Sequence, residues 1–144
     1  MKTTTALMML AALASLHAAG SDPAHGLTEQ RENLTFRYAE FVHAFRNRNW
    51  EHVCTFVDDD TQAGFGPGET GCDGILSVFA NNEQCWEDMQ FALRQGCRIN
   101  KEASGCTSPP QLENDVAYLG ARASFTWDHE SNQLKAGSLI CGGD

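Results

Sequence analysis

The most regular pattern in the chain is an apolar stripe at helical spacing in its first third. The stripe recurs at i, i+4, i+7, i+8 and i+11, at Leu34, Tyr38, Phe41, Val42 and Phe45. This spacing places the five side chains on one face of a helix. Thr28 can cap its N-terminus, and Glu29 and Glu32 suit the positive end of the helix dipole. We therefore predict a helix over residues 28–47.

Shorter helical segments follow this stripe. A second amphipathic segment starts at Trp50 and ends at Asp58–Asp60, because three carboxylates oppose the dipole at a helix C-terminus. Residues 61–74 contain five glycines and a proline, which indicates turns and loop. Helix is expected again at 75–79 and, after an Asn-Asn break, up to Arg94 with the next glycine as its C-cap.

The last third of the chain alternates as β-strands do. Asp115–Trp127 is the strongest predicted strand, and the turn Asp128–Asn132 joins it to Gln133–Cys141 as an antiparallel hairpin. In the second of these strands Leu134, Ala136, Ser138 and Ile140 are expected to share a face. Shorter strands are expected at 97–100 and 105–107. Helices followed by antiparallel strands indicate an α+β fold, with the helices on one face of the sheet.

The first 20 residues have the layout of a secretory signal peptide. Lys2 precedes an apolar run from Ala6 to Leu16, and small residues follow at 18–21. The run is shorter than the roughly 20 apolar residues of a spanning helix. We expect cleavage near residue 20, a flexible leader at 21–27 and one domain at 28–144.

Composition and charge exclude several classes of protein. The 144 residues are 42% hydrophobic, too apolar for a disordered chain, and their formal net charge is -9. Loss of Lys2 with the signal peptide makes the mature chain more acidic by one charge. Nucleic acids and anionic membranes attract basic proteins, so neither is an expected partner.

The six cysteines all follow the predicted cleavage site, at Cys54, Cys72, Cys85, Cys97, Cys106 and Cys141. An even number in an exported chain indicates disulfides, although sequence alone does not choose among the 15 connectivities. A zinc site is a less suitable interpretation, because zinc sites favour C-x-x-C pairs and even the closest two cysteines, Cys97 and Cys106, are farther apart in the sequence.

Asn33-Leu34-Thr35 is the only glycosylation sequon in the sequence. The secreted protein is therefore expected to be a glycoprotein or to carry an unused sequon on the outer face of a helix.

The run from Asn49 to Phe79 carries a family resemblance. A long amphipathic helix leads to Asn47-Arg48-Asn49-Trp50, then Phe56-Val57-Asp58-Asp59, Gly66-Pro67-Gly68, Gly71 and Ile75–Phe79. Over roughly residues 30–140 this order resembles the nuclear transport factor 2-like superfamily. The resemblance implies helices over a strongly curved antiparallel sheet, with a ligand pocket at the wide end of the cone. It also implies that such domains pair through the open face of the sheet, which makes a homodimer an expected assembly.

Departures from that family bear on catalysis. Arg37-Tyr38 matches the oxyanion-hole tyrosine of the ketosteroid isomerase branch, but Phe65-Gly66-Pro67 lacks the carboxylate base that this branch needs to abstract a proton. The paired histidines and tyrosines of scytalone dehydratase are also missing. The chain reaches Cys141–Asp144 where the family's last strand would begin, so the sheet either lacks that strand or belongs to a shortened isoform.

Two groups of acidic residues are weighed against simpler roles. Asp58, Asp59 and Asp60 are consecutive, whereas calcium loops space their ligands at alternate positions, so a solvated helix end is the preferred interpretation. Asp128-His129-Glu130 is read as a turn. No metal and no cofactor is expected.

The functional prediction is a secreted, non-catalytic domain that binds a small apolar molecule or an extracellular protein. The expected pocket is lined by aromatic side chains: Tyr38, Trp50, Phe79, Trp86, Phe125 and Trp127. The alternative is a small lyase or isomerase that uses Tyr38 with Asp58 or Asp128 as its acid–base groups.

Overall fold

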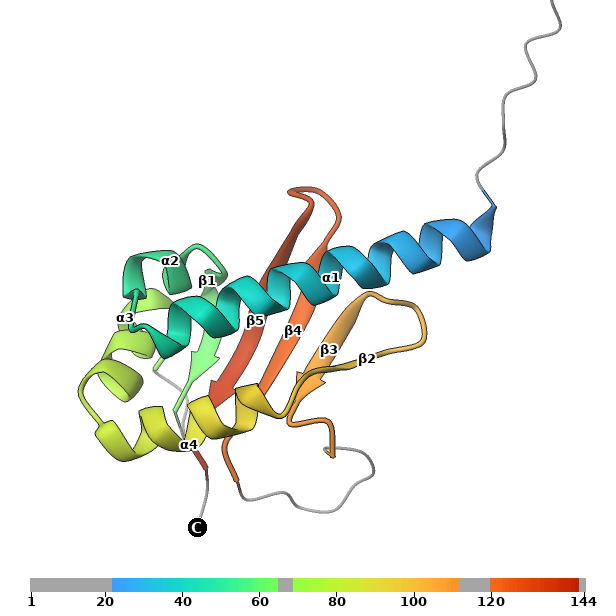
Figure 1. Ribbon diagram of the computed structural model, residues 1–144. Helices are drawn as coiled ribbons and strands as arrows, with labels where there is room; N and C mark the ends of the chain where they lie inside the picture. The colour runs from blue at the N-terminus through green and yellow to red at the C-terminus, as the bar shows by residue number, and fades with distance from the viewer. Residues whose placement is uncertain (1–21, 65–68, 112–119, 143–144) are drawn as a thin grey trace, which may run out of the picture.

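Helices cover one face of a five-stranded sheet, with the long first helix lying across the strands (Figure 1). The computed structural model describes residues 22–64, 69–111 and 120–142. The predicted signal peptide and residues 115–119 of the predicted strand lie outside these ranges. The prediction of an α+β fold with helices packed on one face of a sheet is confirmed.

Helix α1 spans Pro23–Arg46 and begins earlier than the pattern predicts. Asp22 caps it by accepting a hydrogen bond from the N–H of Ala24 at 3.0 Å, and Pro23 occupies a position that needs no donor. Residues 23–27, expected as a flexible leader, therefore form its first turns. The predicted stripe faces the core, where Leu34, Phe41 and Phe45 are fully buried.

Helix α2 is shorter than predicted and a strand follows it. It spans Trp50–Cys54, and strand β1 then spans Val57–Ala63. Asp58–Asp60 are exposed on β1, so the prediction that they end a helix is wrong, as is the loop assignment of 61–63. β1 is an edge strand, so its carboxylates can point to solvent while Thr61 and Ala63 point to the core. The pairing of β1 with β5 therefore outweighs the helical spacing of the apolar residues that precede it.

The next helices agree better with the pattern. Helix α3 spans Gly71–Ile75, the π-helical turn η1 spans Leu76–Ala80, and α4 spans Glu83–Arg94. Asn82 caps α4 by accepting a hydrogen bond from the N–H of Cys85 at 3.1 Å. Gly96 adopts a φ of 104°, which confirms the predicted glycine at the end of this helix.

Strands β2 (Arg98–Ile99), β3 (Gly105–Ser108), β4 (Arg122–Asp128) and β5 (Gln133–Ile140) form an antiparallel meander. The sheet order is β1-β5-β4-β3-β2, and β1 pairs with β5 in parallel. The sheet is therefore mixed and not strongly curled, unlike the curved antiparallel sheet predicted (Figure 1). No tight turn joins β1 to β5, so local sequence does not determine their relative direction.

A β-bulge changes which side chains of β5 face the core. Ser138 pairs with Ser124, but Ala136 pairs with Phe125, so Gly137 is an extra residue. Leu134 and Ala136 share the buried face, and beyond the bulge burial passes to Leu139 and Cys141. The prediction that Ser138 and Ile140 share a face with Leu134 and Ala136 is wrong for this reason.

Three disulfides cross-link the domain, and one of them joins the helices to the sheet. Cys54–Cys72 links α2 to α3, Cys85–Cys141 links α4 to the residue after β5, and Cys97–Cys106 links the residue before β2 to β3. This pairing confirms the disulfide prediction and indicates an oxidising compartment. Within the described ranges, none of the helices has the length and apolar character needed to cross a bilayer.

Candidate functional site

The six aromatic residues predicted to line a pocket belong to the hydrophobic core or pack against it. Tyr38, Phe79, Phe125 and Trp127 are buried, and Trp50 and Trp86 are half-buried. Their rings meet edge to face: Tyr38 contacts Phe125 with centroids 5.4 Å apart, and Phe45 contacts both Trp50 and Phe79 at 5.5 Å. These are the contacts expected of core aromatics.

Tyr38 joins three elements through its hydroxyl. The hydroxyl donates to the carbonyl oxygen of Leu93 at 2.6 Å, with Ser108 Oγ 3.1 Å away. Ser108 Oγ in turn donates to the carbonyl oxygen of Ala92 at 3.0 Å. Burial raises the pKa of Tyr38 to about 12, against a smaller lowering by the Ser108 hydrogen bond. The side chain thus ties α1 to the end of α4 and to β3.

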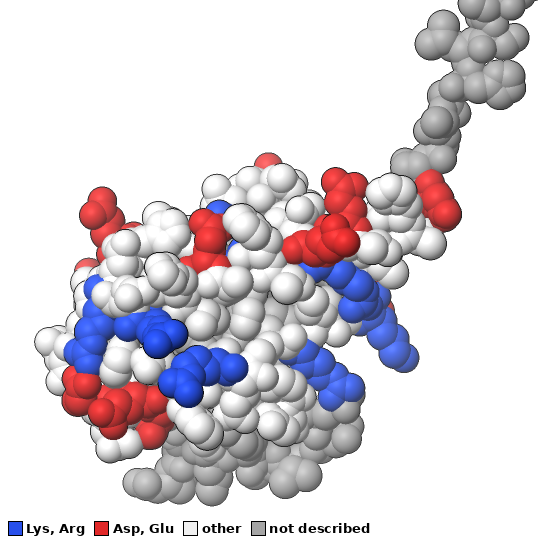
Figure 2. Space-filling view, viewed as in Figure 1, with Lys and Arg blue, Asp and Glu red and all other residues white. Residues whose placement is uncertain are grey.

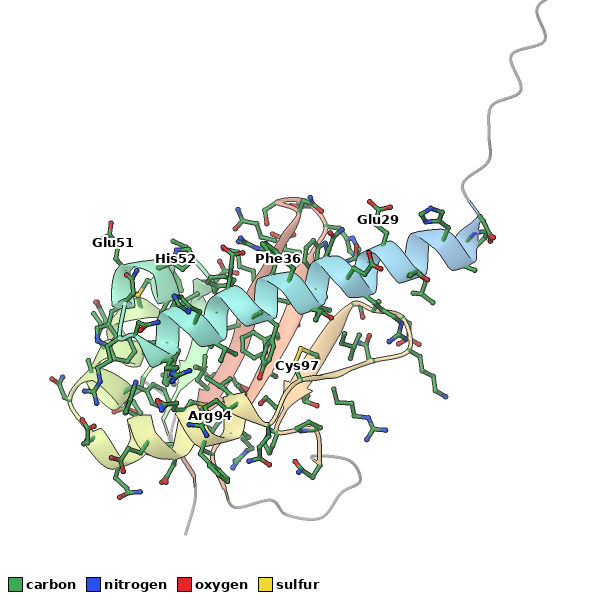
Figure 3. The ribbon with its side chains drawn as sticks, viewed as in Figure 1. Glu29, Phe36, Glu51, His52, Arg94 and Cys97 are labelled. Atoms are coloured by element: carbon green, nitrogen blue, oxygen red, sulfur yellow. A yellow bond between two sulfur atoms is a disulfide. The ribbon has the colours of Figure 1, made fainter. Side chains whose placement is uncertain are left out.

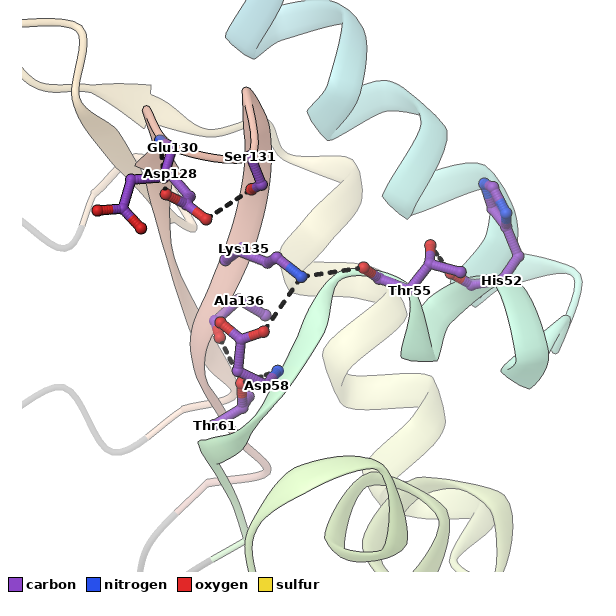
Figure 4. A network of polar contacts seen from close by, with 9 residues as sticks. All are labelled: His52, Thr55, Asp58, Thr61, Asp128, Glu130, Ser131, Lys135 and Ala136. Carbon is purple, nitrogen blue, oxygen red and sulfur yellow. Dashed lines mark hydrogen bonds and ion pairs between the residues drawn. The ribbon is translucent and has the colours of Figure 1, made fainter.

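Asp58 and Asp128, the predicted acids, lie on either side of Lys135 on another part of the sheet (Figure 4). Lys135 Nζ is 3.1 Å from Asp58 Oδ1 and donates to the carbonyl oxygen of Thr55 at 3.5 Å. Together with His129, both carboxylates line a hollow of about 360 Å³ that Tyr38 does not border. The structure therefore brings Asp58 and Asp128 together but places Tyr38 elsewhere.

The predicted turn after β4 supplies hydrogen bonds that lower the pKa of Asp128. Its carboxylate accepts hydrogen bonds from Ser131 Oγ at 2.5 Å and from the N–H of Glu130 at 2.9 Å. The Ser131 hydrogen bond, then the backbone bond from Glu130, and the charge of Lys135 lower the pKa of Asp128. A carboxyl group with a lowered pKa stays ionised to a lower pH, so Asp128 serves the turn as a hydrogen-bond acceptor. The turn interpretation of residues 128–132 is confirmed.

The face of the sheet opposite the helices is polar and hollowed. Small and hydroxyl-bearing side chains of β3 and β4, such as Thr107, Ser124 and Thr126, are only half-buried or exposed there. A hollow of about 520 Å³ crosses β2, β3 and β4, with Arg98 and Lys101 at its rim. Thr126 borders both this hollow and the one that contains Asp58 and Asp128.

The helical face carries separated charges and an exposed aromatic ring. Figure 2 shows Lys and Arg side chains in a band across this face, with acidic side chains above the band and at its lower left. Phe36 on α1 is 67% exposed (Figure 3) and lines a groove of about 400 Å³ between α1 and α2 with Ala39, His43 and His52. Phe36 is not among the site residues predicted from the sequence. Its position off the apolar stripe of α1 was the available signal.

Asn33 of the sequon is exposed on α1, three residues before Phe36. The sequon's Thr35 donates its hydroxyl hydrogen to the carbonyl oxygen of Arg31 at 2.8 Å, as helical threonines often do. Nothing in the described ranges groups three or more His, Cys, Asp or Glu residues so that they could hold a metal ion.

Comparison with known proteins found no matching family model, no matching curated protein and no matching solved structure.

Proposed function

We propose that this chain is a secreted, non-catalytic binding domain with a nuclear transport factor 2-like fold, and that it engages an extracellular protein through the outer face of its sheet. One observation carries the proposal. The described helices lie on a single face of the sheet, and the opposite face presents two adjoining hollows that meet at Thr126.

The order of elements supports the proposed fold. The helices α1, α2, α3 and α4 precede the antiparallel meander and cover one face of it, as the family resemblance implies. The parallel pairing of β1 and the weak curl of the sheet depart from the expected cone. A less curved sheet leaves less room between helices and strands, in keeping with the mutual packing of the aromatic side chains.

The placement of polar groups favours binding over catalysis. The hydroxyl of Tyr38 is engaged with Leu93 and Ser108 inside the domain, whereas Asp58 and Asp128 border a hollow on the sheet that Tyr38 does not line. General acid–base catalysis needs these groups within hydrogen-bond reach of a common substrate. All six cysteines are paired, so a thiol nucleophile is not available either.

The outer face of the sheet has the character of a protein-binding surface. Its hydroxyl groups can exchange hydrogen bonds with a partner, and non-obligate interfaces are about as polar as the remaining protein surface. Carboxylates outnumber cationic side chains around one hollow (Asp58, Asp60 and Asp128 with Lys135), and cationic side chains outnumber carboxylates around the other (Arg98 and Lys101 with Glu102). Such opposite charges at two ends of a surface fix the orientation of a partner.

Site-specific photo-crosslinking tests this proposal. The protein is secreted from its native cells with p-benzoylphenylalanine at position 126, between the two hollows. A matched variant carries the same group at Thr28, which is exposed on α1. We expect a crosslinked protein adduct from position 126 and none from position 28. An adduct with twice the mass of the chain would identify a second copy as the partner. Adducts from both positions, or from neither, would contradict the proposal.

A further inference from the structure

Phe36 is exposed on a helix whose other large apolar side chains are mostly buried. Its exposed fraction, 67%, is the largest among the large hydrophobic residues in the described ranges. The side chain stands on the side of α1 turned away from the sheet (Figure 3). Leaving an aromatic ring in water is unfavourable by the hydrophobic effect, so a group that covers it would stabilise the folded protein.

Asn33 of the sequon lies where such a group can be attached. Residues three apart are neighbours on a helix surface, with Cβ atoms about 5–6 Å apart. Helical side chains also lean toward the N-terminus, so the ring of Phe36 extends over the turn that contains Asn33. Both residues are exposed.

We propose that Asn33 carries an N-linked glycan and that its first N-acetylglucosamine packs on the ring of Phe36. The inference shares only the secretory route with the proposed function and is independent of the outer face of the sheet. The sugar donor is a lipid-linked oligosaccharide with a diphosphate leaving group. The side-chain nitrogen of Asn33 forms a bond to C1 of the sugar, the bond from C1 to the diphosphate oxygen breaks, and the nitrogen loses one proton.

The proposed contact joins the apolar face of the sugar ring to the aromatic ring of Phe36. A pyranose ring presents C–H groups on one side, and these cover an aromatic ring while the hydroxyl groups remain in water. Beyond Phe36, the groove between α1 and α2 continues past the small side chain of Ala39 toward His43. The glycan therefore has an open surface to follow on the side of the helix where it is attached.

Phe91 supplies a matched control. It is 65% exposed, almost the same as Phe36, but it lies on α4 and no sequon precedes it. A general effect of a glycan on stability would act equally on variants of either phenylalanine. A direct contact acts only through Phe36.

The test is a double-mutant cycle on protein secreted from eukaryotic cells. The mass of the wild-type protein first reports whether Asn33 is modified. Melting temperatures are then measured for wild type, Asn33→Gln, Phe36→Ser and the double variant, and for the corresponding set with Phe91→Ser. A further sample is trimmed by an endoglycosidase that leaves a single N-acetylglucosamine.

We expect Asn33→Gln to lower the melting temperature by about 3 °C in the wild-type background and by less than about 1 °C in the Phe36→Ser background. In the Phe91→Ser background the full loss should remain, and the trimmed protein should melt like the untrimmed one. An unmodified wild-type mass would overturn the proposal. So would equal losses in the Phe36→Ser and Phe91→Ser backgrounds, which would leave the proposed binding function untouched.

Discussion

The three disulfides should contribute unequally to the free energy of unfolding, and the contribution of each should increase with the length of the loop that it closes. A disulfide stabilises mainly by restricting the unfolded chain, and the restriction grows with the length of the loop that it closes. Cys85–Cys141 closes 56 residues, Cys54–Cys72 closes 18, and Cys97–Cys106 closes 9. The chain-entropy relation then gives about 4, about 3 and about 2.5 kcal/mol, respectively.

The structure adds a second reason for the rank of Cys85–Cys141. It joins the N-terminal part of α4 to the end of β5, so it connects the helical layer to the sheet (Figure 1). Both sulfur-bearing residues are buried, at 5% and 6% exposure. Replacing them by alanine also removes buried sulfur atoms from the core, which raises the cost further.

The assay is urea unfolding of the mature protein in three variants, each with one pair of cysteines replaced by alanine. Every variant loses the same number of atoms, so each is a control for the others. We expect the free energy of unfolding to fall most for the Cys85/Cys141 variant and least for the Cys97/Cys106 variant. A Cys97/Cys106 variant that loses as much stability as the Cys85/Cys141 variant would refute the reasoning from loop length.

Three further predictions follow from the core and the sheet. Tyr38→Phe should lower the free energy of unfolding by about 1–2 kcal/mol in urea melts, because it removes the donor to the carbonyl oxygen of Leu93; a negligible loss would contradict the role given to this hydroxyl. The raised pKa of Tyr38, about 12, means that the neutral hydroxyl stabilises the fold fully below about pH 10, the unfolded value. That contribution should be lost as the pH rises from about 10 through 12, followed by alkaline denaturation, and Tyr38→Phe should lack this component. Gly105→Ala should disrupt the sheet, because a Cβ there would lie 2.4 Å from the carbonyl oxygen of Phe125, whereas Gly26→Ala meets nothing within 4 Å and should stabilise α1 by about 0.5–1 kcal/mol in the same assay.

Local patterns were sufficient for most of α1, for α4 and for the hairpin of β4 and β5. The stripe from Leu34 to Phe45 faces the core as predicted, because a helix keeps its side-chain period wherever it packs. The turn after Asp128 and the glycine after α4 were also correct, since each depends on a few neighbouring residues. The oxidised state of the cysteines followed from their number and the predicted export.

The candidate site could be predicted only in part. The six aromatic residues predicted to line a pocket lie in the core or pack against it. Whether such rings line a cavity or pack on each other depends on the distance between helices and sheet, which local sequence does not set. Tyr38 was singled out for its hydroxyl, and its engagement with Leu93 depends on a contact across 55 residues of chain. Phe36 was missed because exposure is a property of the assembled surface.

What the amino-acid sequence determined by itself was the identity of most elements, the α+β class and the paired state of the cysteines, because propensity, periodicity and composition act over short distances. The tertiary structure alone decided the parallel pairing of β1 with β5, the bulge at Gly137, and which cysteine bonds to which. It also decided that Asp58 lies beside Lys135 and that Tyr38 does not. These features join residues far apart in the chain, and the free energy that selects them comes from packing the whole domain.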